Sequence, residues 1–203
     1  MIPAFVQARM SSRRFPGKVL APLRGVPILR HVVDRLARVL PPDQIVVATS
    51  ADPSDDPLAA YAERLAVRVF RGALDNVFER FRSCLKAHPC PGFFRISADS
   101  PLLDESLLPV FLEKRLETPA DLITNVFPRS FPRGQSVELL DAAAFATIDP
   151  ATLTAEQQEH LTAVYYQNPT RFRIVNIAST RGDRSGTNLC VDTLPDLERL
   201  ERE

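Results

Sequence analysis

The sequence predicts an α/β fold in which a mostly parallel sheet carries helices on both faces, and three observations support this prediction. Strand and helix signals alternate regularly over the first 116 residues. The run at residues 45–49 (IVVAT) is continuous and rich in β-branched residues, which is typical of a strand covered on both faces. Four successive strand–helix units of this length favour parallel strands joined by right-handed helical crossovers.

The first 120 residues supply these four units. Short apolar runs predict strands at residues 2–6, 45–49, 67–70 and 93–97. Helices are expected at residues 27–40, 59–65, 77–87 and 105–116, and the first of them has a clear apolar stripe. Pro27 suits the first helical position, where an N–H has no intrahelical partner.

After residue 120 the regular alternation ends. Strands are expected at residues 121–126, 136–140, 173–177 and 189–191, with a loop rich in Pro and Arg at residues 127–134. A helix is expected at residues 155–166, and another at the C-terminus. The sequence contains no linker, internal repeat or low-complexity tract, so we predict a single domain over residues 1–203.

The charge balance limits the partners of the protein. The chain has 25 Lys and Arg against 25 Asp and Glu, which gives no general electrostatic reason to bind nucleic acid or an anionic membrane. The N-terminus has only a short apolar run before its first arginines, so we expect neither a signal peptide nor a membrane span. Three unpaired cysteines and three scattered histidines predict a cytoplasmic protein without a zinc site.

The segment from Gln7 to Lys18 follows the first predicted strand and is rich in cations. It contains Arg9, Arg13 and Arg14 besides Lys18, together with two serines and a glycine. Ligands of open α/β sheets bind beyond the carboxyl ends of the strands, and a triphosphate is bound by Arg, Lys and backbone N–H groups. The segment matches neither the Walker A nor the GxGxxG pattern. Its spacing is compatible with phosphate binding and with a solvated basic loop.

Two carboxylates end predicted strands. Asp99 follows the fourth strand, and Asp192 follows the short strand near the C-terminus. Carboxylates at such positions commonly hold Mg²⁺ beside phosphates. The alternative is a helix N-cap, for which Asp104 is better placed than Asp99 and Thr193 serves as well as Asp192. Together with the basic segment, the two carboxylates form a candidate Mg²⁺–nucleotide site.

Five further residues are weaker candidates. Asp75 and Arg80 follow the third strand and are placed to meet a nucleotide, although Arg80 also suits a helix-surface ion pair. Arg129 lies in the proline-rich loop, where it either binds an acidic sugar or stays in solvent. Glu159 and His160 lie on a predicted helix, where an exposed pair is the default interpretation.

The stretch QARMSSRRFPGKVLAPLRGVPIL resembles the signature loop of the cytidylyltransferases that activate acidic sugars. The resemblance is to the 3-deoxy-manno-octulosonate and acylneuraminate types, and it is closest to the branch called spore-coat polysaccharide biosynthesis protein F. It extends along almost the whole chain through IVVATS, FRGALDNVFERF, RISADSPLLD and CVDTLPDLERL.

This resemblance implies a three-layer Rossmann-like nucleotidyltransferase fold, CTP as donor, Mg²⁺ as cofactor and a homodimer. It also implies a nucleotide-binding half at residues 1–120 and a sugar-binding half at residues 121–203. The residues that match the family's triphosphate loop are Arg9, Ser12, Arg14 and Lys18. The metal carboxylates are matched by Asp99 and Asp192, and a segment near the sugar by Glu159 and His160.

The sequence departs from the family pattern at three positions. Arg13 adds a charge to the triphosphate loop, and Ala98 replaces a usual glycine before Asp99. Ser136 stands where the branch often has Asp, which leaves Glu138 as the nearest carboxylate and a candidate substrate residue.

The resemblance predicts transfer of the cytidylyl group of CTP to a sugar, most simply an acidic one, in surface or spore-coat polysaccharide biosynthesis. Lys18, Arg14 and Asp99 are the expected catalytic residues, and we expect Lys18 and Arg14 to act on phosphates and not on folding. No residue stands out as the general base. Two alternatives are a nucleotide-sugar glycosyltransferase and a catalytically silent nucleotide-binding subunit.

Overall fold

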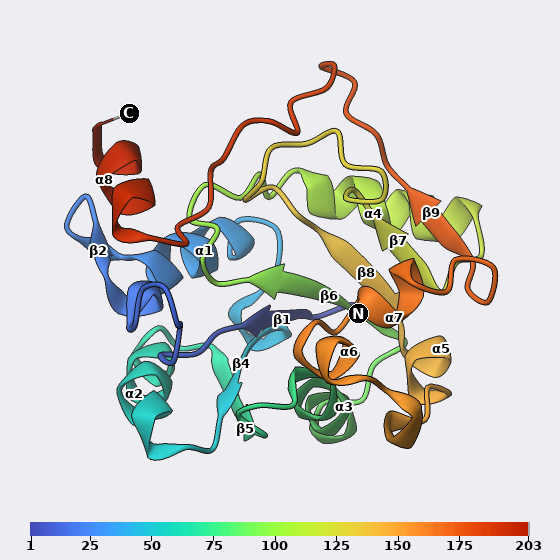
Figure 1. The fold of residues 1–203 in the computed structure, drawn as a ribbon, viewed down its shortest axis with the longest axis horizontal. Helices are drawn as coiled ribbons and strands as arrows, with labels where there is room; N and C mark the ends of the chain where they lie inside the picture. The colour runs from blue at the N-terminus through green and yellow to red at the C-terminus, as the bar shows by residue number, and fades with distance from the viewer. Residues whose placement is uncertain (203) are drawn as a thin grey trace.

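A computed structural model describes residues 1–202, and its centre is a seven-stranded sheet with the order β5-β4-β1-β6-β8-β7-β9 (Figure 1). The strands are β1 (Ala4–Gln7), β4 (Ile45–Ser50), β5 (Arg68–Gly72), β6 (Gly92–Ser97), β7 (Leu122–Thr124), β8 (Glu138–Asp141) and β9 (Ile174–Asn176). Strand β8 pairs antiparallel with β6 and β7, and the other neighbours pair in parallel. The predicted mostly parallel sheet is therefore confirmed.

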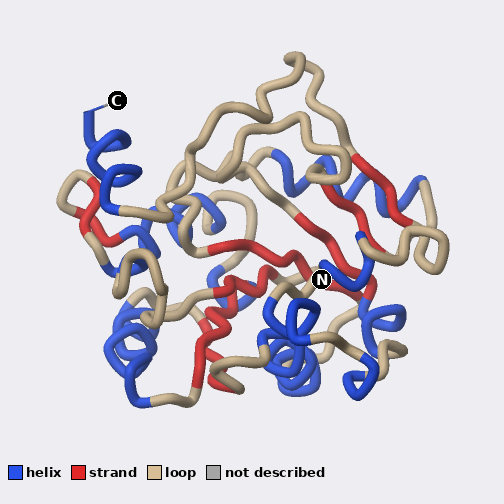
Figure 2. The backbone as a smooth tube through the Cα atoms, viewed as in Figure 1, coloured by secondary structure: helices blue, strands red, loops and turns tan. Residues whose placement is uncertain are grey.

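Helices cover both faces of the sheet, as Figure 2 shows. They are α1 (Ile28–Leu36), α2 (Asp56–Arg64), α3 (Val77–Ala87), α4 (Leu107–Glu117), α5 (Ala142–Ala146), α6 (Ala155–Glu159), α7 (Ala163–Tyr166) and α8 (Leu194–Arg202). A separate two-stranded ribbon, β2 (Pro22–Leu23) with β3 (Val26–Pro27), precedes α1. Within residues 1–202 no helix is long and apolar enough to span a membrane.

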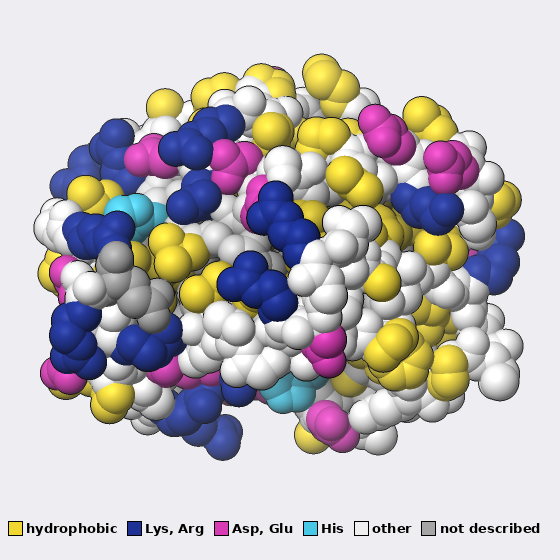
Figure 3. Space-filling view, turned by 90° about the horizontal axis from the view of Figure 1, so that it is seen from above, with side chains coloured by type: hydrophobic (Ala, Val, Ile, Leu, Met, Phe, Trp, Pro, Cys, Tyr) yellow, Lys and Arg dark blue, Asp and Glu magenta, His cyan; other side chains and the backbone are white. Residues whose placement is uncertain are grey.

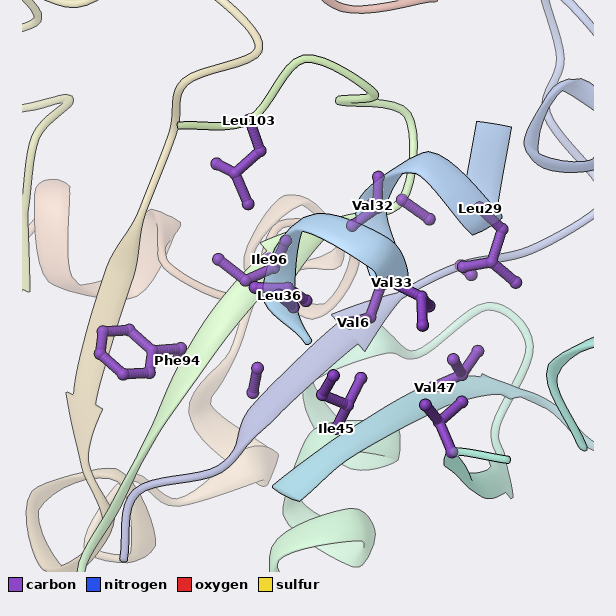
Figure 4. Close-up of a cluster of buried hydrophobic side chains, with 14 of the residues drawn as sticks. Val6, Leu29, Val32, Val33, Leu36, Ile45, Val47, Phe94, Ile96 and Leu103 are labelled. Atoms are coloured by element: carbon purple, nitrogen blue, oxygen red, sulfur yellow. The ribbon is translucent and has the colours of Figure 1, made fainter. Parts of the chain in front are cut away.

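The strands divide their side chains between two apolar clusters because successive residues of a strand point to opposite faces. In β1, Ala4 and Val6 join the cluster under α1, α2 and α4, whereas Phe5 joins the cluster under α3, α5 and α7. Figure 4 shows the first of these clusters, where Val6 and Ile45 of the sheet meet the side chains of α1. Burial on both faces explains why these strands read as continuous apolar runs.

A third, smaller cluster lies at the edge of the molecule, and we call it the terminal cluster. Its buried residues are Leu23, Ile28, Val191, Leu197 and Leu200. It packs α8 against the β2–β3 ribbon and the start of α1, and in Figure 1 these elements lie together on the left. Helix α8 is thereby packed against the residues that follow the basic loop.

Two expected elements of the second half are wrong. The helix expected at residues 155–166 is divided into α6 and α7, because His160 leaves the helical conformation with φ −110° and ψ 86°. The strand expected at residues 189–191 does not form; this segment bends at Cys190, and the Val191 N–H donates to the carbonyl of Asp99 over 2.9 Å. The short helix α5 and the β2–β3 ribbon were not expected from the sequence.

Candidate active site

A cavity of about 820 Å³ opens beyond the carboxyl ends of β1 and β6. From β1 the chain builds outward through β4 to β5, and then returns to place β6 on the other side of β1. The crevice between β1 and β6 is therefore the switch point at which open α/β sheets bind ligands. Figure 3 shows that Lys and Arg side chains gather on the left of the face seen from above, the side on which α8 and β2 lie.

The basic loop after β1 forms one wall of the cavity. Gly17 has a φ of 74°, a left-handed conformation that favours glycine, and its N–H donates to the carbonyl of Met10 over 2.8 Å. The hydroxyl of Ser12 accepts from the N–H of Phe15 over 3.4 Å. These contacts fold the loop back on itself, so that Lys18 begins a short 3₁₀ helix directly above the sheet.

Asp55, which no sequence motif identifies, holds the start of this loop. Its carboxylate is buried and accepts hydrogen bonds from the N–H of Met10 at 2.6 Å, the hydroxyl of Thr49 at 2.8 Å and the N–H of Ser50 at 3.0 Å. Burial acts to raise the pKa of Asp55, but these hydrogen bonds outweigh it and lower the pKa below its ordinary value. Asp55 thus ties the loop after β1 to the end of β4.

Lys18 lies between the two strand-end carboxylates. Its Nζ is 2.6 Å from Oδ2 of Asp99 and 2.9 Å from Oδ1 of Asp192. The other oxygen of Asp192 is 3.0 Å from Arg14 and 3.5 Å from Arg133. Asp99 and Asp192, which lie 81 and 174 positions after Lys18 in the sequence, thus contact the same side chain.

The pKa values in this cluster follow from the contacts. Burial acts to lower the pKa of Lys18, yet the adjacent carboxylates of Asp99 and Asp192 raise it above its ordinary value. Burial acts to raise the pKa of Asp192, but Lys18 and two arginines lower it. Lys18 therefore stays charged and holds the two carboxylates together in the ligand-free protein. Its expected role on phosphates stays a prediction.

Neither carboxylate caps a helix. The N-cap of α4 is Ser106, which has no side-chain cap hydrogen bond, so the expectation that Asp104 caps this helix is wrong; Asp104 only accepts from the N–H of Ser106 over 3.1 Å. Before α8, the hydroxyl of Thr193 accepts from the N–H of Asp196 over 3.4 Å, and Asp196 accepts from the N–H of Thr193 over 2.9 Å. Asp99 and Asp192 are thus left to face the cation between them. The helix-cap alternative considered from the sequence does not describe either residue.

The two carboxylates fit the requirements of a divalent cation. Both already approach a single cationic atom, and the structure places their oxygens within 3 Å of it. Within the described residues, no group of three or more His, Cys, Asp or Glu side chains is arranged to hold a metal ion. Because Mg²⁺ usually takes only one or two protein carboxylates and completes its shell with phosphate and water, two are sufficient.

Helix α6 forms the opposite wall. Glu159 pairs with Arg9 at 2.6 Å, and His160, where the helix ends, also lines the cavity. Ser12, from the basic loop, and Asp75, from the segment after β5, also line the cavity. Arg9, expected to bind phosphate, is thus paired with a carboxylate that was expected near the sugar.

The floor of the cavity contains Gln7 and Arg95, which the sequence did not single out. Arg95 donates to Oε1 of Gln7 over 2.8 Å and pairs with Glu138 at 2.9 Å. Glu138 is buried in β8 and also accepts from the hydroxyl of Tyr166. Burial and the charge of Glu138 raise the pKa of Tyr166. Glu138 therefore supports Arg95 from beneath the floor.

Two candidates lie away from the cavity wall. Arg129 donates to the hydroxyl of Ser136 over 3.1 Å and to the carbonyl of Pro132 over 3.4 Å. Burial lowers the pKa of Arg129, although the charge of Glu138 opposes this shift. Arg80 is fully buried under the segment that carries Asp75, and it is not the surface residue considered from the sequence.

Comparisons with known proteins agree with this geometry. The family model described as Cytidylyltransferase matches residues 4–203. The chain is 30% identical over 202 residues to the spore coat polysaccharide biosynthesis protein SpsF of Bacillus subtilis (strain 168), covering 97% of this chain and 83% of that protein. It is 30% identical over 121 residues to the 3-deoxy-manno-octulosonate cytidylyltransferase of Geobacter sulfurreducens, covering 59% of this chain and 47% of that enzyme.

A solved structure extends the agreement to the fold. The structure of a cytidylyltransferase from Leptospira borgpetersenii serovar Hardjo-bovis superposes with a TM-score of 0.93 at 27% identity. The superposition covers 98% of this chain and 84% of that one.

Proposed function

Because the chain belongs to the cytidylyltransferase family, we propose that it couples CTP to a sugar and releases pyrophosphate. The observation that carries this proposal is the cluster of Lys18 with Asp99 and Asp192 at the switch point, beside a cavity with a basic wall. A nucleoside triphosphate needs cations along its phosphates and a carboxylate-bound metal at the reacting end. The cavity offers both groups.

In the proposed reaction, an oxygen of a sugar hydroxyl attacks the α-phosphorus of CTP. A new oxygen–phosphorus bond forms, the bond from the α-phosphorus to the bridging oxygen breaks, and pyrophosphate leaves. The hydroxyl proton passes to water or to a base that the described residues do not single out. Lys18, Arg14 and Arg9 bind the β- and γ-phosphates and stabilise the charge that develops on the leaving group.

We further propose Mg²⁺ as the metal, held by Asp99 and Asp192. When bound, it neutralises phosphate charge and aligns the triphosphate for in-line attack. Lys18, now paired with both carboxylates, would turn its ammonium group toward the phosphates. The short distances of 2.6 and 2.9 Å support this exchange, because the same two oxygens serve either cation.

The substrate is proposed to be an acidic sugar, in the synthesis of a surface or spore-coat polysaccharide. The support comes from the names of the two relatives, one a spore coat polysaccharide protein and the other a 3-deoxy-manno-octulosonate cytidylyltransferase. Glu159 and His160 line the cavity opposite the basic loop and are the proposed sugar-side residues. The family resemblance also supports a homodimer and a cytoplasmic location, of which sedimentation velocity tests the first.

The test is pyrophosphate release, measured with each of the four NTPs and a panel of acidic and neutral sugars at varied Mg²⁺. We expect release with CTP and an acidic sugar, and loss of turnover in Asp99→Asn and in Asp192→Asn. Asp34→Asn, which changes an exposed carboxylate on α1, is the matched control and should be fully active. CTP binding without release for any sugar would instead support a silent nucleotide-binding subunit.

A further inference from the structure

The floor of the cavity continues one face of the sheet. Gln7 of β1 lies on the same face as Phe5, because alternate residues of a strand share a face. For the same reason, Ser97 of β6 lies on the face of Phe93. The two phenylalanines belong to one buried cluster, and Gln7 and Ser97 are direct partners in the pairing of β1 with β6. Neighbouring strands lie about 4.8 Å apart, so a single small group in the cavity can contact both side chains.

Arg95 fixes the orientation of the Gln7 amide. Oε1 of Gln7 accepts from Nε of Arg95 over 3.1 Å and from Nη2 over 2.8 Å. Because arginine has only donors, the amide oxygen must face it and the NH₂ group must turn away. Among residues 1–202, Nε2 of Gln7 has no hydrogen-bond partner. Gln7, which lines the cavity, therefore offers donors to a ligand.

Ser97 offers the opposite polarity. Its hydroxyl donates to Oδ1 of Asp99 over 2.7 Å, and an ionised carboxylate can only accept. The single hydroxyl hydrogen is thereby used, and the lone pairs of Ser97 remain as acceptors at the cavity. A donor and an acceptor thus lie side by side. A ligand hydroxyl satisfies both of them, by accepting from Gln7 and donating to Ser97.

The floor carries no unbalanced charge. The guanidinium group of Arg95 pairs with Glu138 at 2.9 Å, and Glu138 is buried beneath it. A carboxylate that leaves water needs a cation to offset its charge, and here the cation is already paired. A carboxylate would also face the lone pairs of Ser97. The floor therefore favours an uncharged hydroxyl group.

The position of the floor indicates which substrate reaches it. From β1 the floor extends to β6 and, through Arg95 and Glu138, to β8. Asp75, which is expected to meet the nucleotide, follows β5 on the other side of β1. The bond from Ser97 to Asp99 places the floor beside the proposed metal site. A group bound here belongs to the molecule that approaches the metal from the side of β8, which is the acceptor sugar.

We propose that Gln7 and Ser97 are specificity-determining residues that bind one hydroxyl group of the acceptor sugar, and that Arg95 is the positioning residue for the Gln7 amide. This inference rests on the proposed function, since it assumes that the cavity takes a sugar beside CTP. Nε2 of Gln7 donates to the hydroxyl oxygen, and the hydroxyl hydrogen is donated to Oγ of Ser97. An analogue that lacks this hydroxyl leaves both partners unpaired and is selected against.

The first experiment follows the side-chain amide signal of Gln7 by NMR, with the signal identified by its absence in Gln7→Met. The protein is saturated with CMP and titrated with 3-deoxy-manno-octulosonate, with N-acetylneuraminate or with mannose. We expect at least one of these probes to shift the Gln7 signal. If none of the three shifts it, the proposal is wrong.

The second experiment measures the affinity for that probe by calorimetry. Gln7→Met and Ser97→Ala should each weaken it about three- to tenfold, because each removes one hydrogen bond between uncharged groups. The double variant should lose less than the product of the two factors, since both residues contact one hydroxyl. Unchanged affinity in Gln7→Met would overturn the proposal. Unchanged or tighter binding in Ser97→Ala would also overturn it, because that is the result expected for a carboxylate.

A third variant tests the positioning role of Arg95. Arg95→Lys keeps the positive charge beside Glu138, but an ammonium group does not reproduce the planar pair of donors that holds the Gln7 oxygen. Affinity for the probe should fall as in Gln7→Met, while the ligand-free melting temperature changes little. A purely structural role for Arg95 predicts the reverse, a lower melting temperature with unchanged affinity.

Two controls separate this site from its surroundings. Gln44→Met changes a half-buried glutamine at the amino end of β4, on the opposite edge of the sheet, and should leave the affinity for the probe unchanged. CTP affinity should be unchanged in Gln7→Met, and a loss would place the ribose over the floor and refute the assignment to the sugar. Failure of pyrophosphate release with every sugar would count against the proposed reaction, whereas the titrations depend on binding alone.

Discussion

Replacing Lys18 by Met removes the cation between Asp99 and Asp192 and should destabilise the ligand-free protein. At distances of 2.6 and 2.9 Å, each attraction amounts to about 6 kcal/mol at an effective dielectric constant of about 20. Desolvation of the three groups offsets most of this sum. We expect a net loss of about 3 kcal/mol, in the range observed when one partner of a buried ion pair is removed.

The assay is thermal unfolding of the ligand-free protein at several MgCl₂ concentrations. For a chain of this length, a loss of about 3 kcal/mol corresponds to a melting temperature lower by about 6–12 °C. Mg²⁺ should restore part of this loss in Lys18→Met, because it neutralises the two carboxylates, and should have little effect on the unmodified protein. Lys114→Met, which breaks an exposed pair with Glu117 on α4, is the control and should shift the melting temperature little.

Two results would refute this reasoning. An unchanged melting temperature in Lys18→Met would mean that Arg14 and Arg133 alone neutralise the carboxylates. A lower melting temperature that does not respond to Mg²⁺ would mean that the two carboxylates separate once Lys18 is gone, and that they do not form a preorganised metal site.

Two further predictions concern the walls of the cavity. Hydrogen bonds lower the pKa of Asp55 in the folded protein, so its carboxylate stabilises the fold above the ordinary pKa of 3.8, and this stabilisation is lost as the pH falls through the lower folded value. The variant Asp55→Asn should therefore lose about 2 kcal/mol of unfolding free energy at pH 7. In urea unfolding, its stability should also depend less on acid pH than that of the unmodified protein. A parallel pH dependence in both proteins would contradict this assignment. Glu159→Gln should free Arg9 for phosphate and tighten CTP binding by about two- to fivefold in calorimetry, since the pair is partly exposed. Weaker binding would show instead that Glu159 positions the nucleotide.

Local sequence patterns were sufficient to predict the sheet and the edge at which the candidate residues meet. Strands β1, β4 and β6 are short, mainly apolar runs, and Asp99 follows β6 closely. Because parallel strands end at a common edge, the polar residues after them were expected to lie together. The structure brings Lys18, Asp99 and Asp192 into contact at this edge.

Contacts between distant segments could not be predicted in the same way. Asp55 follows β4 without any motif, and its role depends on its contact with Met10, 45 residues away. Arg95 lies within β6, where a single polar residue in an apolar strand does not reveal that it reaches a cavity floor. The division between α6 and α7 depends on the backbone of His160, while the apolar periodicity continues across it.

The terminal cluster has a consequence for reading mutational screens. Leu197 and Leu200 lie on α8, away from the cavity, but they pack in one cluster with Val191, the residue before Asp192. The two larger clusters that hold the sheet do not include these residues. Substitutions here would therefore score as loss of activity in a protein that still accumulates normally, a pattern that is usually assigned to residues in contact with substrate. In this protein, the same pattern would identify apolar residues that hold Asp192 in position through Val191.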